Sequence, residues 1–443
     1  MTGAALQLNP PEPEVPAILL QARERTLSRL LVAYAITGLL FMLLPGTFLG
    51  VWNLISISKL HALTSAAWIQ AHGHAQIFGW IGTFIIGIGF YSIPRVTGNT
   101  RFALWRGWAT WILWTLGVTM RWYANVSAWH WRVLLPLSAA FELTAFLIFY
   151  TSIRRHRIQP APQHRPPTPV WVLLVLASTV GFFLALVLNL IVAVLTAMKA
   201  PDPAFSPVFE QRLLVLSTWG FLVLAVWGFN ARWLPTFLGL PPPRREWLMR
   251  ALYLDTIAIL SGMAGWWSLT MTLLLLAASA AAYGLRVFES AERPAKTTGV
   301  HSSFPLFVRL CYAWLILAAV LQIVALWADH AHGFVGASRH ALTVGFLACM
   351  VFAMGQRVLP AFTGMKILFS PKLMFACLAL LNFGCAIRVI AEVLAYEGFS
   401  QRAWSALPVS ALAEMAAVVL FAANLVFTFL SVAPHKKLIT IAS

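Results

Sequence analysis

The sequence predicts an all-α polytopic membrane protein with about 12 transmembrane helices, and three observations support this fold class. Of the 443 residues, 60% are hydrophobic and only 10% are charged, a composition that excludes a soluble globular domain. The apolar residues are gathered into runs of about 20, the length at which an α-helix crosses a bilayer. Lysine and arginine are concentrated in every second connection between these runs, as is typical of multi-pass membrane proteins.

Twelve apolar runs define the expected helices in chain order. We place them at about 28–50, 66–93, 104–123, 131–151, 170–196, 211–232, 248–267, 269–288, 305–327, 338–359, 372–395 and 405–431. The seventh and eighth runs are nearly continuous and are expected to meet in a tight turn around Trp267, so eleven or thirteen helices would also fit. The expected organisation is an N-terminal tail (1–27), a single transmembrane domain (28–431) and a C-terminal tail (432–443). The polar, proline-rich start lacks the pattern of a cleavable signal peptide.

The net charge of +17 follows membrane topology. Basic residues come after the second, fourth, sixth, eighth and tenth runs and at the chain end, whereas the opposite connections carry acidic residues. Because loops rich in lysine and arginine face the cytoplasm, both termini are expected to be cytoplasmic. The expected partner is therefore the lipid bilayer, and no nucleic acid is expected.

One pattern occurs three times along the chain, at 72–98, 213–239 and 338–364. Aligned on Pro94, Pro235 and Pro360, each copy has a glycine fifteen residues before the proline and another glycine four residues after it. We expect the proline to end each helix at the inner surface and the glycine to permit the turn beyond it. The spacing predicts three pseudo-symmetric four-helix units. These units are expected at 28–158, 170–289 and 305–431.

Histidine occupies the same position in two of the three copies. His74 and His340 each lie twenty residues before their proline, and the middle copy has Val215 there. His72 lies two residues before His74, so the two side chains point about 200° apart on a regular helix and only one can face a given partner. The face of His72 continues into polar residues, and the face of His74 continues into apolar residues that suit a porphyrin edge. The choice stays open, and the other histidine can cap the helix or lie in the wet interface.

These histidines are candidate metal ligands. Two imidazoles from facing helices at one depth can bind haem iron axially, and neutral imidazole suits iron and copper alike. The candidates are therefore His340 with His72 or His74. Arg339, next to His340, is a candidate partner for a haem propionate, with a snorkelling interface arginine as the alternative. His330 and His332 follow Asp329 in an outer loop and can hold copper, a second metal or propionates, with a merely polar loop as the alternative.

Several other ionisable residues fall within apolar runs. Arg388 and Glu392 are four residues apart on one expected helix, so they can satisfy each other. Glu142 and Asp255 have no local partner in the sequence and are candidates for a proton path or for structural hydrogen bonds.

The histidine pattern resembles subunit I of haem–copper oxidases, in which histidines on the second and tenth helices bind a low-spin haem. Carried over, this resemblance implies His72 (or His74) and His340 as haem ligands. The oxidase copper site also needs a histidine on the sixth helix and a pair at the seventh. The sixth run here offers Ser217, Thr218 and Trp219, and the seventh has no histidine. Oxygen reduction at a dinuclear centre is therefore not expected.

A closer resemblance is to the NnrS family of haem- and copper-containing membrane proteins. The segment HGHAQIFGW (72–80) is similar to the family signature H-A-H-E-M-L-F-G-F, and the family signature H-A-L-T-V-G is intact at 340–345. An R-V pair follows as Arg357-Val358. Two features depart from the family: Ala75-Gln76 replaces Glu-Met, and 361–364 reads AFTG where the family has G-H-T-G. The aromatic-rich opening motif of the family is missing as well.

This resemblance implies a haem protein of the bacterial inner membrane with a redox or nitric-oxide-stress role. The haem is expected to be b-type and copper is an additional cofactor, while a respiratory electron donor and a small gaseous ligand are the expected partners. Two alternatives use the same residues differently: a transporter or copper-delivery protein, and a non-catalytic subunit of a respiratory complex. Whether the protein is an enzyme, and in which oligomeric state it works, is left open.

Overall fold

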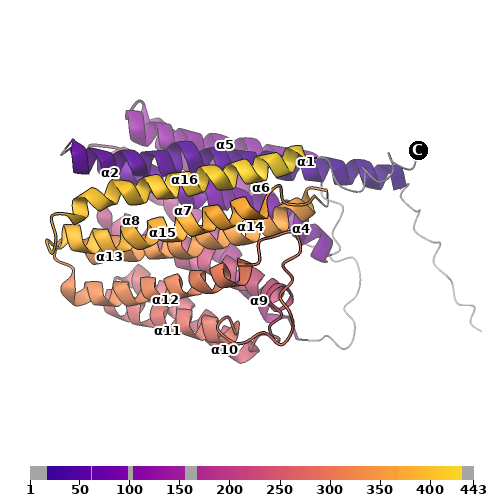
Figure 1. Ribbon diagram of the computed structural model, residues 1–443. Coiled ribbons are helices and arrows are strands. Elements are labelled where there is room, and N and C mark those ends of the chain that lie inside the picture. The colour runs from indigo at the N-terminus through magenta and orange to yellow at the C-terminus, as the bar shows by residue number, and fades with distance from the viewer. Residues whose placement is uncertain (1–16, 61, 98–102, 155–166, 365, 432–443) are drawn as a thin grey trace, which may run out of the picture.

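The computed structural model describes residues 17–60, 62–97, 103–154, 167–364 and 366–431, and every regular element in these ranges is helical (Figure 1). The helices form twelve long spans that run back and forth along one direction (Figure 1). Ten of these spans are long and apolar enough to cross a membrane. The protein is therefore a multi-pass helical membrane protein, which confirms the predicted fold class.

Four spans are interrupted by a π-helical segment. Span 1 comprises α1 (Ala17–Phe41), η1 (Met42–Phe48) and α2 (Leu49–Lys59). Span 2 comprises α3 (Ala66–His74), η2 (Ala75–Gly82) and α4 (Thr83–Thr97). Span 6 comprises α8 (Pro207–Val215), η3 (Leu216–Val223) and α9 (Leu224–Leu238). Span 10 comprises α13 (Gly333–His340), η4 (Ala341–Ala348) and α14 (Cys349–Phe362).

The other eight spans are single α-helices. Spans 3, 4, 5 and 7 are α5 (Leu104–Ser127), α6 (Trp131–Ile153), α7 (Val170–Lys199) and α10 (Arg245–Ala264). Spans 8, 9, 11 and 12 are α11 (Trp267–Gly284), α12 (Phe304–Ala328), α15 (Pro371–Tyr396) and α16 (Ala403–Leu430). We call the end of the bundle at α2, α8 and α13 the outer end and the end at α4, α9 and α14 the inner end, following the predicted topology (Figure 1).

The first helix begins earlier than predicted, at Ala17 instead of residue 28. Glu24 in this extension accepts a hydrogen bond from Tyr91 (2.9 Å) and pairs with Arg95, both on α4. This tertiary contact, which hydropathy cannot reveal, joins part of the predicted N-terminal tail to the helical bundle. The rest of that tail (1–16) and the predicted C-terminal tail (432–443) lie outside the described residues.

The repeat prolines do not end their helices, contrary to the prediction. Helices α9 and α14 continue past Pro235 and Pro360, because a proline removes only one backbone donor and a helix near its end can complete another turn. The chain turns at Gly239 (φ +70°) and Gly364 (φ +104°), in the left-handed region that glycine adopts without strain. The turn between spans 7 and 8 likewise uses a left-handed glycine, Gly265 (φ +87°), just before the predicted position.

The three repeats share a π-helical segment in one register. Segments η2, η3 and η4 begin immediately after His74, Val215 and His340, the three aligned positions of the repeat. Each π turn accommodates one additional residue, so it changes which side chains share a face further along the span. Such segments are frequent at functional sites, and here two of the three adjoin a histidine.

Glu397, which follows α15, fixes the start of span 10 at the outer end. Its carboxylate accepts hydrogen bonds from the backbone N–H groups of His330 (3.0 Å), Ala331 (3.3 Å) and Gly333 (2.9 Å). Desolvation acts to raise the pKa of Glu397, but these three donors act in the opposite direction and leave the pKa below its usual value. The carboxylate therefore helps to hold α13 in place.

Acidification is expected to weaken this attachment. Because the folded-state pKa of Glu397 lies below the unfolded value of about 4.3, its stabilisation is present above that pH and is lost as the pH falls through the folded value. Thermal unfolding of the wild type and of Glu397→Gln, measured from about pH 7 to about pH 3, should therefore converge at the acidic end. Glu292→Gln, at an exposed glutamate, is the control. A constant difference between wild type and Glu397→Gln at every pH would contradict the prediction.

Candidate functional site

A cavity of about 380 Å³ is lined by residues of spans 1, 2, 6, 8, 9, 10, 11 and 12, towards the outer end of the bundle. Its walls are mostly apolar, with charged and imidazole side chains placed among them. The polar lining residues include His72, Arg339, His340, Arg388 and Glu392. Small-molecule and cofactor sites commonly have this size and this mixture of an apolar wall with a few polar groups.

His72 is held by its Nδ1 atom, and its other ring nitrogen has no hydrogen-bond partner among the described residues. Nδ1 lies 2.7 Å from the carbonyl oxygen of Gly46 in η1, and because a carbonyl only accepts, Nδ1 carries the proton. The unprotonated Nε2 is then an available lone pair. Gly50 permits this ring position, since a Cβ atom there would lie 2.8 Å from His72 Cε1.

His340 is held in the same way from the opposite wall. Its Nδ1 donates to the carbonyl of Gly336 (3.0 Å) and lies 2.9 Å from Glu392 Oε2. Arg388 Nε lies 3.3 Å from that carboxylate, which confirms the predicted Arg388–Glu392 pair. Glu392 therefore contacts both Arg388 and His340. A histidine whose Nδ1–H faces a carboxylate and a carbonyl has a fixed ring orientation and a more basic Nε2.

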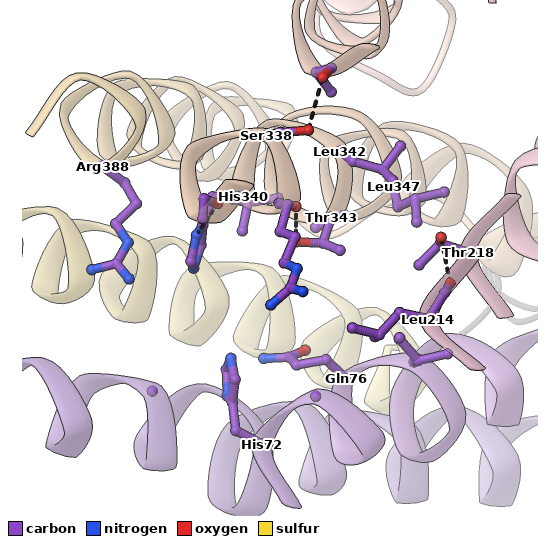
Figure 2. Close-up of a pocket in the computed structure, with 18 of the residues that line it drawn as sticks. His72, Gln76, Leu214, Thr218, Ser338, His340, Leu342, Thr343, Leu347 and Arg388 are labelled. Atoms are coloured by element: carbon purple, nitrogen blue, oxygen red, sulfur yellow. Dashed lines mark hydrogen bonds between the residues drawn. The ribbon is translucent and has the colours of Figure 1, made fainter. Parts of the chain in front are cut away.

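Figure 2 shows how these groups meet. His72 comes from α3 and His340 from α13, and both rings extend towards the space between the two spans, with Gln76 and Arg388 beside it (Figure 2). Arg339 also lines the cavity, and Nη1 of Arg388 has no hydrogen-bond partner in the described part of the chain. The cavity therefore combines two opposed imidazoles with two guanidinium groups.

His74 lies outside this cavity. Its Nε2 is 2.7 Å from Glu142 Oε1 on α6, and the second oxygen of Glu142 accepts from Asn189 (3.3 Å) on α7. His74 and Glu142 are both buried, at 8% and 0% exposure. His72 and His74 therefore lie on different sides of span 2, as predicted from their two-residue spacing on one helix.

The loop histidines are not part of the cavity lining. His332 is 89% exposed, and its Nδ1 lies 3.7 Å from Asp329 Oδ2. The backbone of His330 is bonded to Glu397, as described above. Within the described ranges, no group of three or more His, Cys, Asp or Glu side chains is arranged to hold a metal ion.

Glu414 is a cavity residue that the sequence analysis missed. It lies on α16, one of its carboxylate oxygens has no partner among the described residues, and its side chain packs over Gly384 of α15. Glu142 packs over Gly117 of α5 with the same contacts.

The sequence contains a second repeated pattern that marks this glutamate. Each of the two glutamates follows a serine by four residues, as Ser138-x-x-x-Glu142 and Ser410-x-x-x-Glu414. Extending the repeat to the fourth helix of each unit would have found this glutamate.

The architecture is similar to that of a solved haem–copper terminal oxidase. That structure, described as a cryo-EM structure of a heme-copper terminal oxidase dimer, superposes with a TM-score of 0.55 over 92% of this chain and 84% of the oxidase chain. The sequences are 11% identical, so the likeness shows the fold alone. The chain is thus a helical membrane protein of the haem–copper oxidase fold class. A search of curated proteins gives no match.

The family model of the NnrS protein matches residues 23–432. The chain therefore belongs to the NnrS family, as its signatures at 72–80 and 340–345 predicted. The match includes all twelve spans, from within α1 to the end of α16.

Proposed function

We propose that the cavity binds a haem whose iron lies between His72 and His340. The observation that carries this proposal is the pair of opposed imidazoles, each anchored through Nδ1 and each with an Nε2 that has no hydrogen bond within the described part of the chain. We propose a b-type haem, held by its axial ligands without a covalent bond to the protein. Bound there, a haem would supply one-electron redox chemistry and affinity for small gases.

The other cavity residues fit the haem as well. Arg339 and Arg388 can pair with the two propionates, and the free Nη1 of Arg388 supports this role. The apolar wall of the cavity would contact the porphyrin face, and this contact is favourable because it removes apolar surface from water. His74 faces Glu142 instead, so we propose His72 and not His74 as the ligand on span 2.

The two proposed ligands differ in their support. His340 faces the carboxylate of Glu392, which raises the basicity of its free nitrogen, whereas His72 donates only to a neutral carbonyl. His340 is therefore the firmer ligand of the pair. His72 would therefore hold the haem less firmly than His340.

Oxygen reduction of the oxidase type is not part of the proposal. Ser338 stands where the resemblance to the oxidases would place a second histidine of the tenth helix, two residues before His340. Its hydroxyl instead bonds to the carbonyl of Ala318 (2.7 Å) and to Gln322 (2.9 Å). The residues of the outer loop do not fit a copper ion in their present arrangement, so no step is assigned to copper at His330 and His332. We propose a redox or nitric-oxide-stress role for the haem in a bacterial inner membrane, with both termini cytoplasmic.

The visible spectrum of the purified protein tests this function. A Soret band that shifts on reduction with dithionite, together with the sharp α-band of a six-coordinate low-spin haem, is the expected result. Extraction of the pigment as a pyridine complex would identify the haem type. A protein that is purified intact from haem-replete cells and shows no Soret band, oxidised or reduced, would overturn the proposal.

A further inference from the structure

A second cavity, of about 100 Å³, lies between spans 2, 6 and 10 on the inner side of the first. We propose that this central pocket binds small, uncharged, non-polar molecules of diatomic size and exchanges them with the cavity above it. The binding itself needs no haem. Only the purpose of the exchange rests on the function proposed above.

The two cavities share a wall made by equivalent residues of the three repeats. Ile81, Leu222 and Leu347 line both cavities, and each lies thirteen residues before its repeat proline. All three belong to the π-helical segments η2, η3 and η4. One turn further inwards, the equivalent residues Phe84, Ala225 and Met350 line the central pocket. These three aliphatic side chains form the wall that the two cavities share, so exchange between the cavities requires a change of their rotamers.

The lining of the pocket offers little to water. Asn230 is the only amide, hydroxyl or charged side chain among the described lining residues, and its Nδ2 donates to the Tyr312 hydroxyl (2.8 Å) and lies 3.7 Å from Met350 Sδ. A buried water needs two to four polar partners, whereas apolar cavities of this order stay dry and take up xenon or small hydrocarbons. The pocket therefore favours a non-polar occupant.

The same lining excludes polar and charged solutes. An ion such as nitrite would lose its hydration in the pocket and find no charged partner among the described lining residues, which makes its entry strongly unfavourable. The larger cavity differs, because Glu210, Arg339 and Glu392 contribute charge to its walls. Only neutral, non-polar molecules are expected to pass the aliphatic barrier.

Aromatic side chains lie at the inner end of the pocket. Trp233 lines the pocket and packs edge-on against Phe362 (ring centroids 6.1 Å apart), which in turn stacks on Tyr91 (4.9 Å). These residues come from α9, α14 and α4, one from each repeat-bearing span. The cluster extends the apolar surroundings of the pocket towards the inner end of the bundle, and the wall shared with the larger cavity is the proposed route of exchange.

Xenon is the probe that tests this binding site. Crystals or detergent-solubilised full-length protein under xenon pressure should show xenon between Ile81, Ala225 and Met350, by anomalous diffraction or by ¹²⁹Xe NMR. In Ala225→Leu the added carbons fill the space, and xenon occupancy is expected to fall at least about tenfold. Ala225→Val, with a smaller volume change, is the second variant in case the leucine overpacks. Ala313→Leu, at an exposed alanine on α12, should retain wild-type occupancy.

Three outcomes separate this inference from the haem proposal. Ordered water or no xenon in the wild-type pocket, or unchanged xenon occupancy in Ala225→Leu, would overturn the inference. Xenon in the pocket of a protein without a Soret band would uphold the binding site and refute the haem function. Leu222→Ala should speed the exchange of xenon between the two cavities, measured by ¹²⁹Xe NMR, and an unchanged exchange rate would refute passage through the barrier.

Discussion

Glutamine in place of His340 is expected to remove nearly all haem from the purified protein. Glutamine keeps a polar side chain of similar length but cannot replace an imidazole nitrogen as an axial ligand of iron. His340 is also the better supported of the two proposed ligands, because its Nδ1 faces Glu392 and Gly336. The ratio of Soret absorbance to protein absorbance should fall at least about tenfold. Loss of an outer-shell partner alone already weakens metal binding about 10- to 100-fold, and loss of the ligand itself should have at least this effect.

The same substitution at the other two histidines provides matched controls. His72→Gln is expected to lose the low-spin spectrum, whereas His74→Gln should keep it, because His74 lies outside the cavity and a glutamine can still bond to Glu142. Glu392→Gln should retain the ligand set but weaken haem binding by about 10- to 100-fold. A normal spectrum in His72→Gln combined with haem loss in His74→Gln would reverse the assignment on span 2.

Leucine in place of His74 is expected to destabilise the protein by about 3–5 kcal/mol, the cost of leaving a buried charged partner without its counterpart. Glu142 is fully buried, and without His74 its carboxylate retains only Asn189 as a close hydrogen-bond partner among the described residues. Thermal or denaturant unfolding in detergent measures the loss. Haem content per folded molecule should be unchanged, which distinguishes this structural role from the role of His72.

A double-mutant cycle completes the test. The variant His74→Leu/Glu142→Leu removes both partners, and replacing a buried pair by apolar residues is often neutral or stabilising. The double variant should therefore recover most of the stability that either single variant loses. Strictly additive losses would show that His74 and Glu142 contribute independently, against the 2.7 Å contact between them.

Hydropathy predicted the twelve spans because apolar runs determine where helices cross a bilayer. It could not predict that α1 begins at Ala17, since that extension depends on the contacts of Glu24 with Tyr91 and Arg95. Helical geometry predicted that His72 and His74 face opposite sides. Which side holds the cavity depends on the rotation of span 2 against spans 1 and 4, and only the contacts with Gly46 and Glu142 establish it.

The π-helical segments left no signal in the repeat alignment. A π turn often arises from one inserted residue, which would appear as a gap when related segments are compared. Here η2, η3 and η4 occur at the same place in all three copies, so the copies align without a gap. The whole-unit symmetry predicted from the repeat stays a prediction, although the serine–glutamate pairs on α6 and α16 agree with it.

The contact between Gly336 and Glu392 also bears on natural variation within the family. A Cβ atom at Gly336 would clash with Glu392 Oε1, so any side chain there displaces the carboxylate that faces His340. A relative that carries alanine or a larger residue at this position must therefore have lost the carboxylate, moved it, or shifted span 11. Gly336 can thus serve as a diagnostic position for sorting family members by the ligand environment they retain.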